Sequence, residues 1–153
     1  MNFVERDALP SDRNLPLIPP VAPPRDEERL CILVVEDDAG DAYLIKSALA
    51  KNPRVAEVVV ARDGVEALQL IDLRATQLDL AIVDLHMPRK DGFALLREFA
   101  CRDTVKFPSV VLTSSRGGAD ALRAKKRGAM AYLAKPNTAA ELTTALDKVI
   151  ASL

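Results

Sequence analysis

The chain has 153 residues, with 21 lysines and arginines against 22 acidic residues and a formal net charge of −1. This length suits one domain with a tail, large enough for a hydrophobic core without disulfide or metal staples. The balanced charge gives no overall field that would draw the protein to nucleic acid or anionic lipid, so we expect neither partner.

Cysteine usage and hydropathy exclude further classes. Two cysteines without CxxC spacing and a single histidine argue against a zinc site. No apolar run approaches the roughly 20 residues that span a bilayer, and the N-terminus lacks the basic-then-apolar pattern of a secretory signal. We therefore expect a cytoplasmic protein without a membrane partner.

Residues 1–29 hold six of the ten prolines, most of them in the stretch LPLIPPVAPPRDEER. This composition favours extended, polyproline-like chain over helix. We interpret the segment as a proline-rich N-terminal arm, most simply a disordered leader. Its apolar residues provide an alternative, because they could dock on a partner or on a second copy of the chain: Leu15, Leu17, Ile18 and Val21.

From Leu30 onward, short apolar runs alternate with segments of helical period, which predicts a parallel sheet covered by helices. The predicted strands are 30–35, 55–61, 79–84, 108–113 and 130–134, and the predicted helices are 39–51, 63–75, 92–102, 116–128 and 138–152. Five such units with right-handed crossovers predict a doubly wound α/β fold, which binds ligands beyond the carboxyl ends of its strands.

A few residues are expected to fix the ends of these elements. Asp38 and Thr138 stand at the N-cap positions of the first and last helices, and Gly128 suits a left-handed helix stop. The core is expected to include Ala124, Ala129, Met130 and the leucines at helical spacing.

Acidic side chains gather where the strands end. Glu36 and Asp37 follow the first strand, and Asp84 ends the third. Three carboxylates at one edge repel one another, and a hard divalent cation relieves that repulsion. Mg²⁺ suits such a site because it accepts a few carboxylates and leaves positions for phosphate oxygens. Asp84, followed by the open turn MPRKDG, is the candidate nucleophile toward phosphorus.

Two further side chains at this edge suit phosphoryl chemistry. Lys135, after the fifth strand, supplies an ammonium that neutralises a transferred phosphoryl group, and Thr113, at the end of the fourth, supplies a hydroxyl. Each residue has an ordinary explanation, because acids cap helices, lysines lie in solvent and threonines form strands. Their occurrence on successive strand ends of one fold favours the functional interpretation.

The stretches ILVVEDD, ARDGVEAL, IVDLHMPRKDG, VVLTSS and GAMAYLAKP resemble, in this order, the receiver domain of two-component response regulators over residues 30–153. The resemblance implies a flavodoxin-like (βα)5 fold with a five-stranded parallel sheet of order 2-1-3-4-5. It also implies the site roles: Asp84 as phosphoacceptor, Lys135 as the site lysine, Thr113 and Tyr132 as switch residues, and Glu36, Asp37, Asp84 and the backbone carbonyl of His86 as Mg²⁺ ligands.

The mechanism that the resemblance implies is phosphoryl transfer from the phosphohistidine of a sensor histidine kinase to Asp84, with Mg²⁺ and Lys135 holding the developing charge. Thr113 would then move toward the phosphoryl oxygens and Tyr132 would rotate into the vacated space, which changes a surface of the fourth and fifth helices and the fifth strand. The Lys135–Pro136 peptide is expected to be cis.

Two finer features concern partners. EDDAGDAYLIKSAL and VVLTSS are similar to the single-domain regulators paired with bacterial phytochromes, which makes a bacteriophytochrome the candidate kinase. The basic segment RAKKRG at 123–128 is interpreted as the solvated face of a helix, with partner contact as the alternative.

We therefore predict a stand-alone phospho-receiver, not an enzyme acting on a separate substrate, that signals by changing its protein contacts. A homodimer through the fourth helix, fifth strand and fifth helix, or through arm exchange, is a further expectation. The alternative is a non-phosphorylated receiver-fold scaffold or dimerisation module. A haloacid-dehalogenase-like phosphatase is excluded, because DLHMP lacks the second aspartate of a DxDxT motif.

Overall fold

The computed structural model of the protein describes residues 29–87, 89–114 and 117–153. Its strands are β1 (Leu30–Val35), β2 (Val55–Ala61), β3 (Leu80–Val83), β4 (Ser109–Thr113) and β5 (Ala131–Ala134). They form one parallel sheet in the order β2-β1-β3-β4-β5, which confirms the predicted fold class. The proline-rich arm lies outside the described residues except for Arg29, and it stays a prediction.

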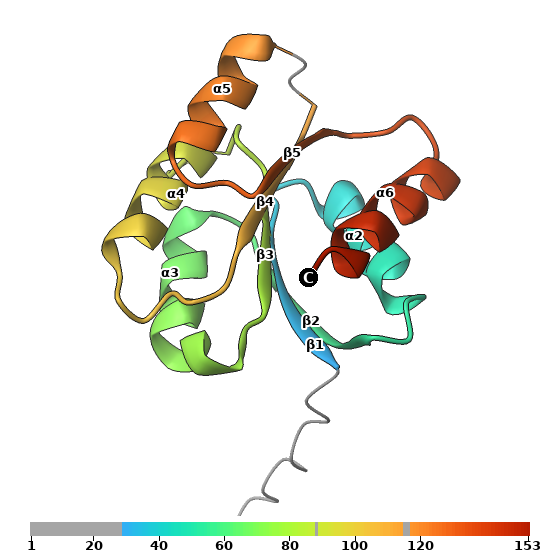
Figure 1. The fold of residues 1–153 in the computed structure, drawn as a ribbon, viewed down its shortest axis with the longest axis horizontal. Coiled ribbons are helices and arrows are strands. Elements are labelled where there is room, and N and C mark those ends of the chain that lie inside the picture. The colour runs from blue at the N-terminus through green and yellow to red at the C-terminus, as the bar shows by residue number, and fades with distance from the viewer. Residues whose placement is uncertain (1–28, 88, 115–116) are drawn as a thin grey trace, which may run out of the picture.

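Helices cover both faces of the sheet (Figure 1). One face carries α2 (Ala39–Ala50) and α6 (Ala139–Ala151). The other face carries α3 (Gly64–Arg74), which continues into the short 3-10 helix η2 (Ala75–Gln77), together with α4 (Gly92–Cys101) and α5 (Gly118–Lys126). Two-sided cover is what right-handed crossovers on both sides of a parallel sheet produce.

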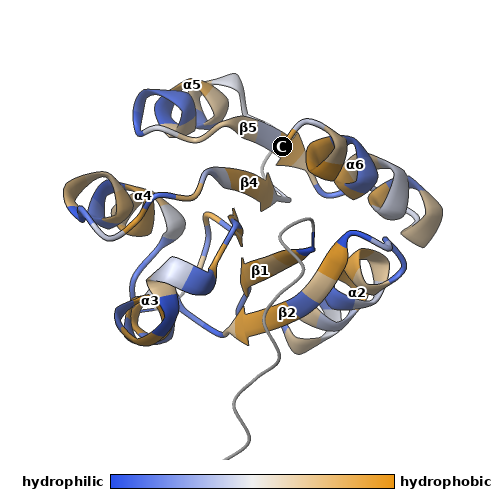
Figure 2. Ribbon diagram, turned by 60° about the horizontal axis from the view of Figure 1, so that its bottom comes forward, coloured by the Kyte–Doolittle hydropathy of each residue, from blue (hydrophilic) through white to orange (hydrophobic). Residues whose placement is uncertain are grey.

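The strands β1 and β3 at the centre of the sheet are hydrophobic throughout (Figure 2), as expected where helices bury both faces. All residues of β1, β3 and β4 are buried. Alternate side chains of β1 enter different cores: Leu33 packs in the cluster that includes α3 and α4, whereas Ile32 packs in the cluster that includes α2 and α6. The central strands are therefore packed from both sides.

Side-chain caps fix the helix starts beside the carboxyl edge of the sheet. Four helices carry such a cap, from Asp38, Asp63, Asp91 and Thr138. Asp38 Oδ1 accepts a hydrogen bond from Asp41 N at 2.8 Å, which leaves the first turn of α2 in a defined position. Gly128 has a φ of 95°, in the left-handed region. The N-caps at Asp38 and Thr138 and the glycine stop are thus confirmed.

The edge of the sheet at β5 corrects one prediction. Ala124 and Ala129 are buried as expected, but Met130 keeps 44% of its surface exposed. β5 is an edge strand, and α5 buries no larger side chain than Ala124, so the residue before the strand meets solvent. The prediction that the helical leucines lie in the core is also wrong for Leu122 of α5, Leu44 of α2 and Leu73 of α3, which are exposed. This edge therefore presents apolar surface.

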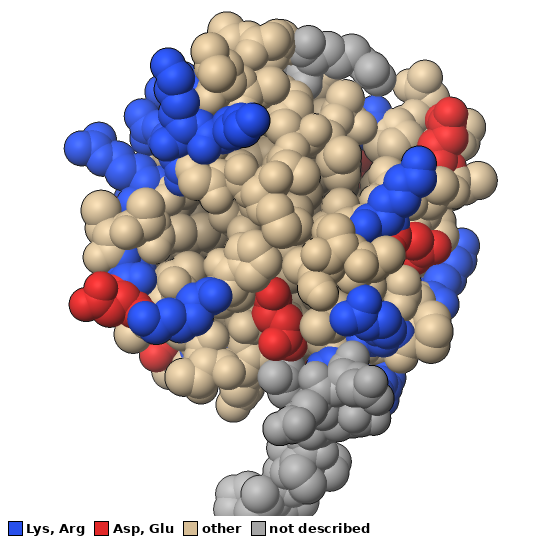
Figure 3. Space-filling model, in the orientation of Figure 1, with Lys and Arg blue, Asp and Glu red and all other residues tan. Residues whose placement is uncertain are grey.

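Basic side chains gather over α5, at the upper left of Figure 3. Arg123, Lys125 and Lys126 are all exposed. The Arg123 guanidinium lies 3.9 Å from the centroid of the Phe93 ring, so its apolar plane packs while its charge stays in solvent. This placement agrees with a solvated helix face. None of the described helices is long and apolar enough to cross a membrane.

Candidate functional site

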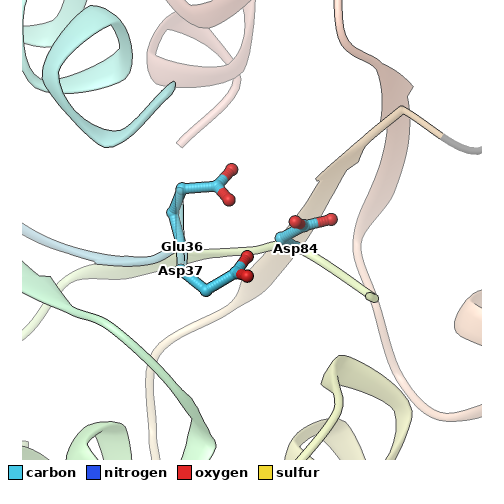
Figure 4. A group of neighbouring side chains, drawn as sticks. All are labelled: Glu36, Asp37 and Asp84. Atoms are coloured by element: carbon cyan, nitrogen blue, oxygen red, sulfur yellow. The ribbon is translucent and has the colours of Figure 1, made fainter. Parts of the chain in front are cut away.

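The topology brings the ends of β1 and β3 together, because these strands are neighbours and run parallel. Asp84 N donates a hydrogen bond to Val35 O at 3.0 Å, and Glu36 N donates to Ala61 O at 2.9 Å. These bonds continue the sheet one residue past each strand. As a result Glu36, Asp37 and Asp84 emerge at one edge, with Asp37 extended toward Asp84 (Figure 4).

The three carboxylates form a tight acidic cluster. One oxygen from each of Glu36, Asp37 and Asp84 lies within 4.8 Å of the other two. Glu36 and Asp84 are only 1% and 6% exposed, so water screens their repulsion poorly. A set of carboxylate oxygens with one solvent-exposed member fits a hard divalent cation that keeps some of its waters, as Mg²⁺ does.

Lys135 is the cation of the site. Its backbone N donates to Thr113 O at 2.7 Å, which anchors the residue beside the end of β4. Its Nζ donates to Glu36 Oε1 at 2.5 Å and to Asp41 Oδ2 at 2.8 Å, and it lies 3.6 Å from Asp84 Oδ2. One ammonium is thus surrounded by three carboxylates, two of them buried.

Burial and neighbouring charges shift the pKa values of Glu36 and Lys135. Burial raises the pKa of Glu36 to about 7, because the hydrogen bond and charge of Lys135 offset only part of the lost hydration and Asp84 adds repulsion. Burial alone would lower the pKa of Lys135, but hydrogen bonds to Asp41 and Glu36 and the charge of Asp84 raise it above its usual value. Lys135 therefore stays charged, while Glu36 is poised to exchange its proton near neutral pH.

The two predicted switch residues lie on one face of the sheet. Thr113 is fully buried at the end of β4, and Tyr132 packs, partly buried, against the core on the α3–α5 side. Tyr132 pairs with Val111, and Val111 and Thr113 are alternate residues of β4, so all three share that face. Their neighbourhood permits the predicted coupling, and their switch roles stay predictions.

The backbone of His86 lies next to the acidic cluster, whereas its side chain points to α5. Its backbone N lies 3.5 Å from Asp84 Oδ1, so the main chain after Asp84 turns back on the carboxylate. The imidazole is 59% exposed, with Nε2 3.7 Å from Asp120 Oδ2 on α5. The structure therefore keeps the His86 main chain next to the acidic cluster, and its carbonyl ligation of a metal stays a prediction.

One backbone expectation is wrong. No described peptide bond is cis, so the Lys135–Pro136 peptide is trans. Lys135 reaches the acids from this trans peptide because its main chain is already hydrogen-bonded to the end of β4.

The structure adds two contacts that the sequence does not predict. Asp41 lies in the first turn of α2, and its carboxylate binds Lys135 across 94 positions. Asp63, the cap of α3, also accepts from Arg89 Nε at 2.8 Å and so ties the loop after β3 to α3. Arg89 adopts a φ of 65°, in the left-handed region. Pair identities of this kind depend on the fold, and no local pattern signals them.

Known proteins with a similar sequence point to one family. The family model described as response regulator receiver domain matches residues 32–147. The transcriptional regulatory protein PdtaR of Mycobacterium tuberculosis is 38% identical over 122 residues, which cover 78% of this chain and 56% of that protein. The chain spans between 31% and 56% of the length of the first curated relatives that it matches.

Solved structures agree with this result. The phosphorylated cyanobacterial phytochrome response regulator RcpA superposes with a TM-score of 0.72 at 31% identity, covering 79% of this chain and 91% of RcpA. The Mn²⁺-bound form of response regulator Rcp1 superposes with a TM-score of 0.68 at 26% identity, covering 78% of this chain and 91% of Rcp1. The fold, the acidic edge and the matched residues lead to one conclusion: the chain belongs to the response regulator receiver domain family.

Proposed function

We propose that this receiver accepts a phosphoryl group on Asp84 from the phosphohistidine of a sensor histidine kinase, in a Mg²⁺-dependent reaction. The observation that carries the proposal is the setting of Asp84, which is buried next to two further carboxylates and 3.6 Å from the Lys135 ammonium. In the transfer, an Asp84 oxygen forms a bond to phosphorus while the phosphorus–nitrogen bond to the kinase histidine breaks.

The other residues have supporting roles in this proposal. Glu36, Asp37, Asp84 and the His86 carbonyl would hold Mg²⁺, whose charge offsets that of the phosphoryl oxygens. Lys135 offers an ammonium that is hydrogen-bonded to Glu36 and lies 3.6 Å from Asp84 Oδ2. The hydroxyl of Thr113 would donate to a phosphoryl oxygen. A divalent cation is supported by the close carboxylates and by the Mn²⁺ bound to Rcp1, which shares the fold.

Phosphorylation can be tested directly by intact mass spectrometry. Wild-type protein incubated with Mg²⁺ and acetyl phosphate is expected to gain the mass of a single phosphoryl group. Asp84→Asn removes the nucleophilic oxygen with almost no change of shape, so we expect no adduct with this variant. Chelation of Mg²⁺ is expected to abolish the adduct as well. A Thr144→Ala variant on the exposed face of α6 serves as a control that keeps full phosphorylation.

The same experiment decides between the two classes of function. An unmodified wild type that still binds Mg²⁺ would contradict the receiver activity and favour a non-phosphorylated scaffold. An adduct that persists in Asp84→Asn would place the acceptor on another residue.

Metal binding should depend on pH through Glu36. Its pKa of about 7 lies above the ordinary value of 4.5, so in the metal-free protein the proton competes with Mg²⁺ over the neutral range. We expect the dissociation constant for Mg²⁺ to rise about tenfold between pH 8 and pH 6, because only ionised Glu36 can ligate. Isothermal titration calorimetry at several pH values measures this. A Glu36→Gln variant should bind more weakly and lose most of the pH dependence.

We also propose how the signal leaves the domain. The apolar edge formed by α5, β5 and α6 carries exposed Leu122 and Met130 and two surface hollows of about 410 Å³ and about 650 Å³. This surface suits a protein partner, including a second copy of the chain. Sedimentation velocity of phosphorylated and unphosphorylated protein tests whether this surface forms a homodimer. An unchanged mass distribution would contradict a homodimer that depends on phosphorylation.

The likeness to RcpA, a phytochrome response regulator, supports a phytochrome-type histidine kinase as the phosphodonor. A cytoplasmic location and action as a stand-alone domain, without enzymatic turnover of a separate substrate, complete the proposal.

A further inference from the structure

The Lys135 ammonium forms hydrogen bonds with two acids of the site, but not with the proposed phosphoacceptor. Its Nζ makes hydrogen bonds of 2.5 Å to Glu36 Oε1 and 2.8 Å to Asp41 Oδ2, but it lies 3.6 Å from Asp84 Oδ2. The last distance exceeds the range of an N–H to oxygen hydrogen bond. Unphosphorylated protein therefore holds its site lysine on the side of β1 and α2.

Asp41 is well suited to hold the lysine and to release it. Its main chain is fixed in the first turn of α2, where its N–H donates to the Asp38 side chain at 2.8 Å. Its carboxylate is outside the group of three that could share a metal. The side chain of Asp41 is 42% exposed, whereas that of Glu36 is 1% exposed. A released Asp41 would be hydrated by solvent, but a released Glu36 would be an unpaired buried charge.

We propose that Asp41 is a positioning residue that keeps Lys135 out of hydrogen-bonding reach of Asp84 until phosphorylation. The inference rests on the proposed phosphorylation of Asp84. An aspartyl phosphate would bring nearly two negative charges and three strong acceptor oxygens to a point that Lys135 already approaches. Phosphoryl oxygens carry more charge than the exposed Asp41 carboxylate, so the ammonium exchanges Asp41 for a phosphoryl oxygen while it keeps Glu36.

This exchange makes Asp41 a competitor of the phosphoryl group. Its removal would leave the hydrogen bond to Glu36 in place but take away the second hydrogen bond that holds the ammonium from Asp84, so the variant should be phosphorylated faster. Removal of a residue that merely stabilised the fold would leave the rate of phosphorylation unchanged or lower it. The direction of the change therefore separates positioning from a structural role.

The experiment compares wild type, Asp41→Ala, Asp41→Glu and the charge-matched control Asp103→Asn, whose exposed acid lies in the loop after α4. Phosphorylation by acetyl phosphate at saturating Mg²⁺ is followed by intact mass. We expect Asp41→Ala to react about fivefold faster, the factor for one solvent-exposed charged contact. Asp41→Glu should restore part of the wild-type rate, and Asp103→Asn should match wild type.

A second readout does not depend on phosphorylation. Exchange of the Lys135 ammonium protons with water, measured by ¹⁵N NMR in metal-free protein, should be slow in wild type and in Asp103→Asn and faster in Asp41→Ala. Unchanged exchange, or a rate of phosphorylation that is unchanged or lower in Asp41→Ala, would overturn the role of Asp41 while the receiver activity stands. A wild type that is never phosphorylated would overturn both.

Discussion

Replacing Gly92 by alanine is expected to destabilise the protein by about 3 kcal/mol, the upper end of the usual cost of overpacking. A Cβ atom at this position would clash with Asp84 O and would lie 2.7 Å from Leu85 Cα. Both atoms belong to the main chain, so no rotation of a side chain can relieve the clash. Gly92 N also donates to Leu85 O at 2.9 Å, which holds the two segments together.

The same clash falls on the segment that carries the proposed phosphoacceptor. Because the main chain of Asp84 must shift to admit the methyl group, we expect Gly92→Ala to bind Mg²⁺ more weakly and to accept phosphate more slowly. Urea denaturation measures the free energy of unfolding, and calorimetry measures the metal affinity.

Gly118 offers a matched control. It also begins a helix, but a Cβ atom there would meet no atom within 4 Å. Gly118→Ala should leave stability unchanged or raise it by up to about 1 kcal/mol, because alanine has the higher helix propensity. If Gly92→Ala were as stable as Gly118→Ala, the close approach of α4 to Asp84 would be refuted.

The fold followed from the sequence because local signals agreed with one another. Apolar runs alternated with helical segments, and Asp38 and Thr138 marked helix starts that the structure confirms. The acidic cluster was also accessible, since carboxyl ends of parallel strands must meet at one edge. Glu36, Asp37 and Asp84 could therefore be grouped from their positions in the sequence alone.

Features that depend on side-chain direction or on distant pairing were not accessible. The sequence places Asp41 in a helix turn, but whether its carboxylate faces solvent or Lys135 depends on how α2 sits against the sheet. Met130 was assigned to the core from its apolar character, and its exposure follows from the shortness of α5 beside an edge strand. The pairing of Asp63 with Arg89 likewise depends on the path of one loop.

Lys135→Met should destabilise the metal-free protein by about 2 kcal/mol near pH 8. The ammonium stands among Glu36, Asp41 and Asp84, and its loss leaves buried carboxylates without a compensating charge. Breaking a buried ion pair costs about 3–5 kcal/mol, and we expect less here because Lys135 is 18% exposed and Glu36 can take up a proton.

The pH dependence of this loss has a definite sign. The pKa of Glu36 is already raised from 4.5 to about 7 in the folded protein, and removal of Lys135 raises it further. A carboxyl with a raised folded pKa lowers stability above that pKa and has no such effect below its unfolded value. The destabilisation by Lys135→Met should therefore be large at pH 8 and small at pH 5.

Mg²⁺ provides the decisive comparison, because a bound divalent cation would replace the missing positive charge among the acids. Urea denaturation of wild type and Lys135→Met is to be measured at pH 5 and pH 8, with and without Mg²⁺. The difference in the free energy of unfolding should be largest at pH 8 without Mg²⁺ and small under the other three conditions. Lys148→Met, on the exposed face of α6, removes a lysine remote from the acids and should show neither dependence. If Lys135→Met lowered the free energy of unfolding by the same amount at both pH values and with or without Mg²⁺, lost packing and not lost charge would explain the contribution of Lys135 to stability.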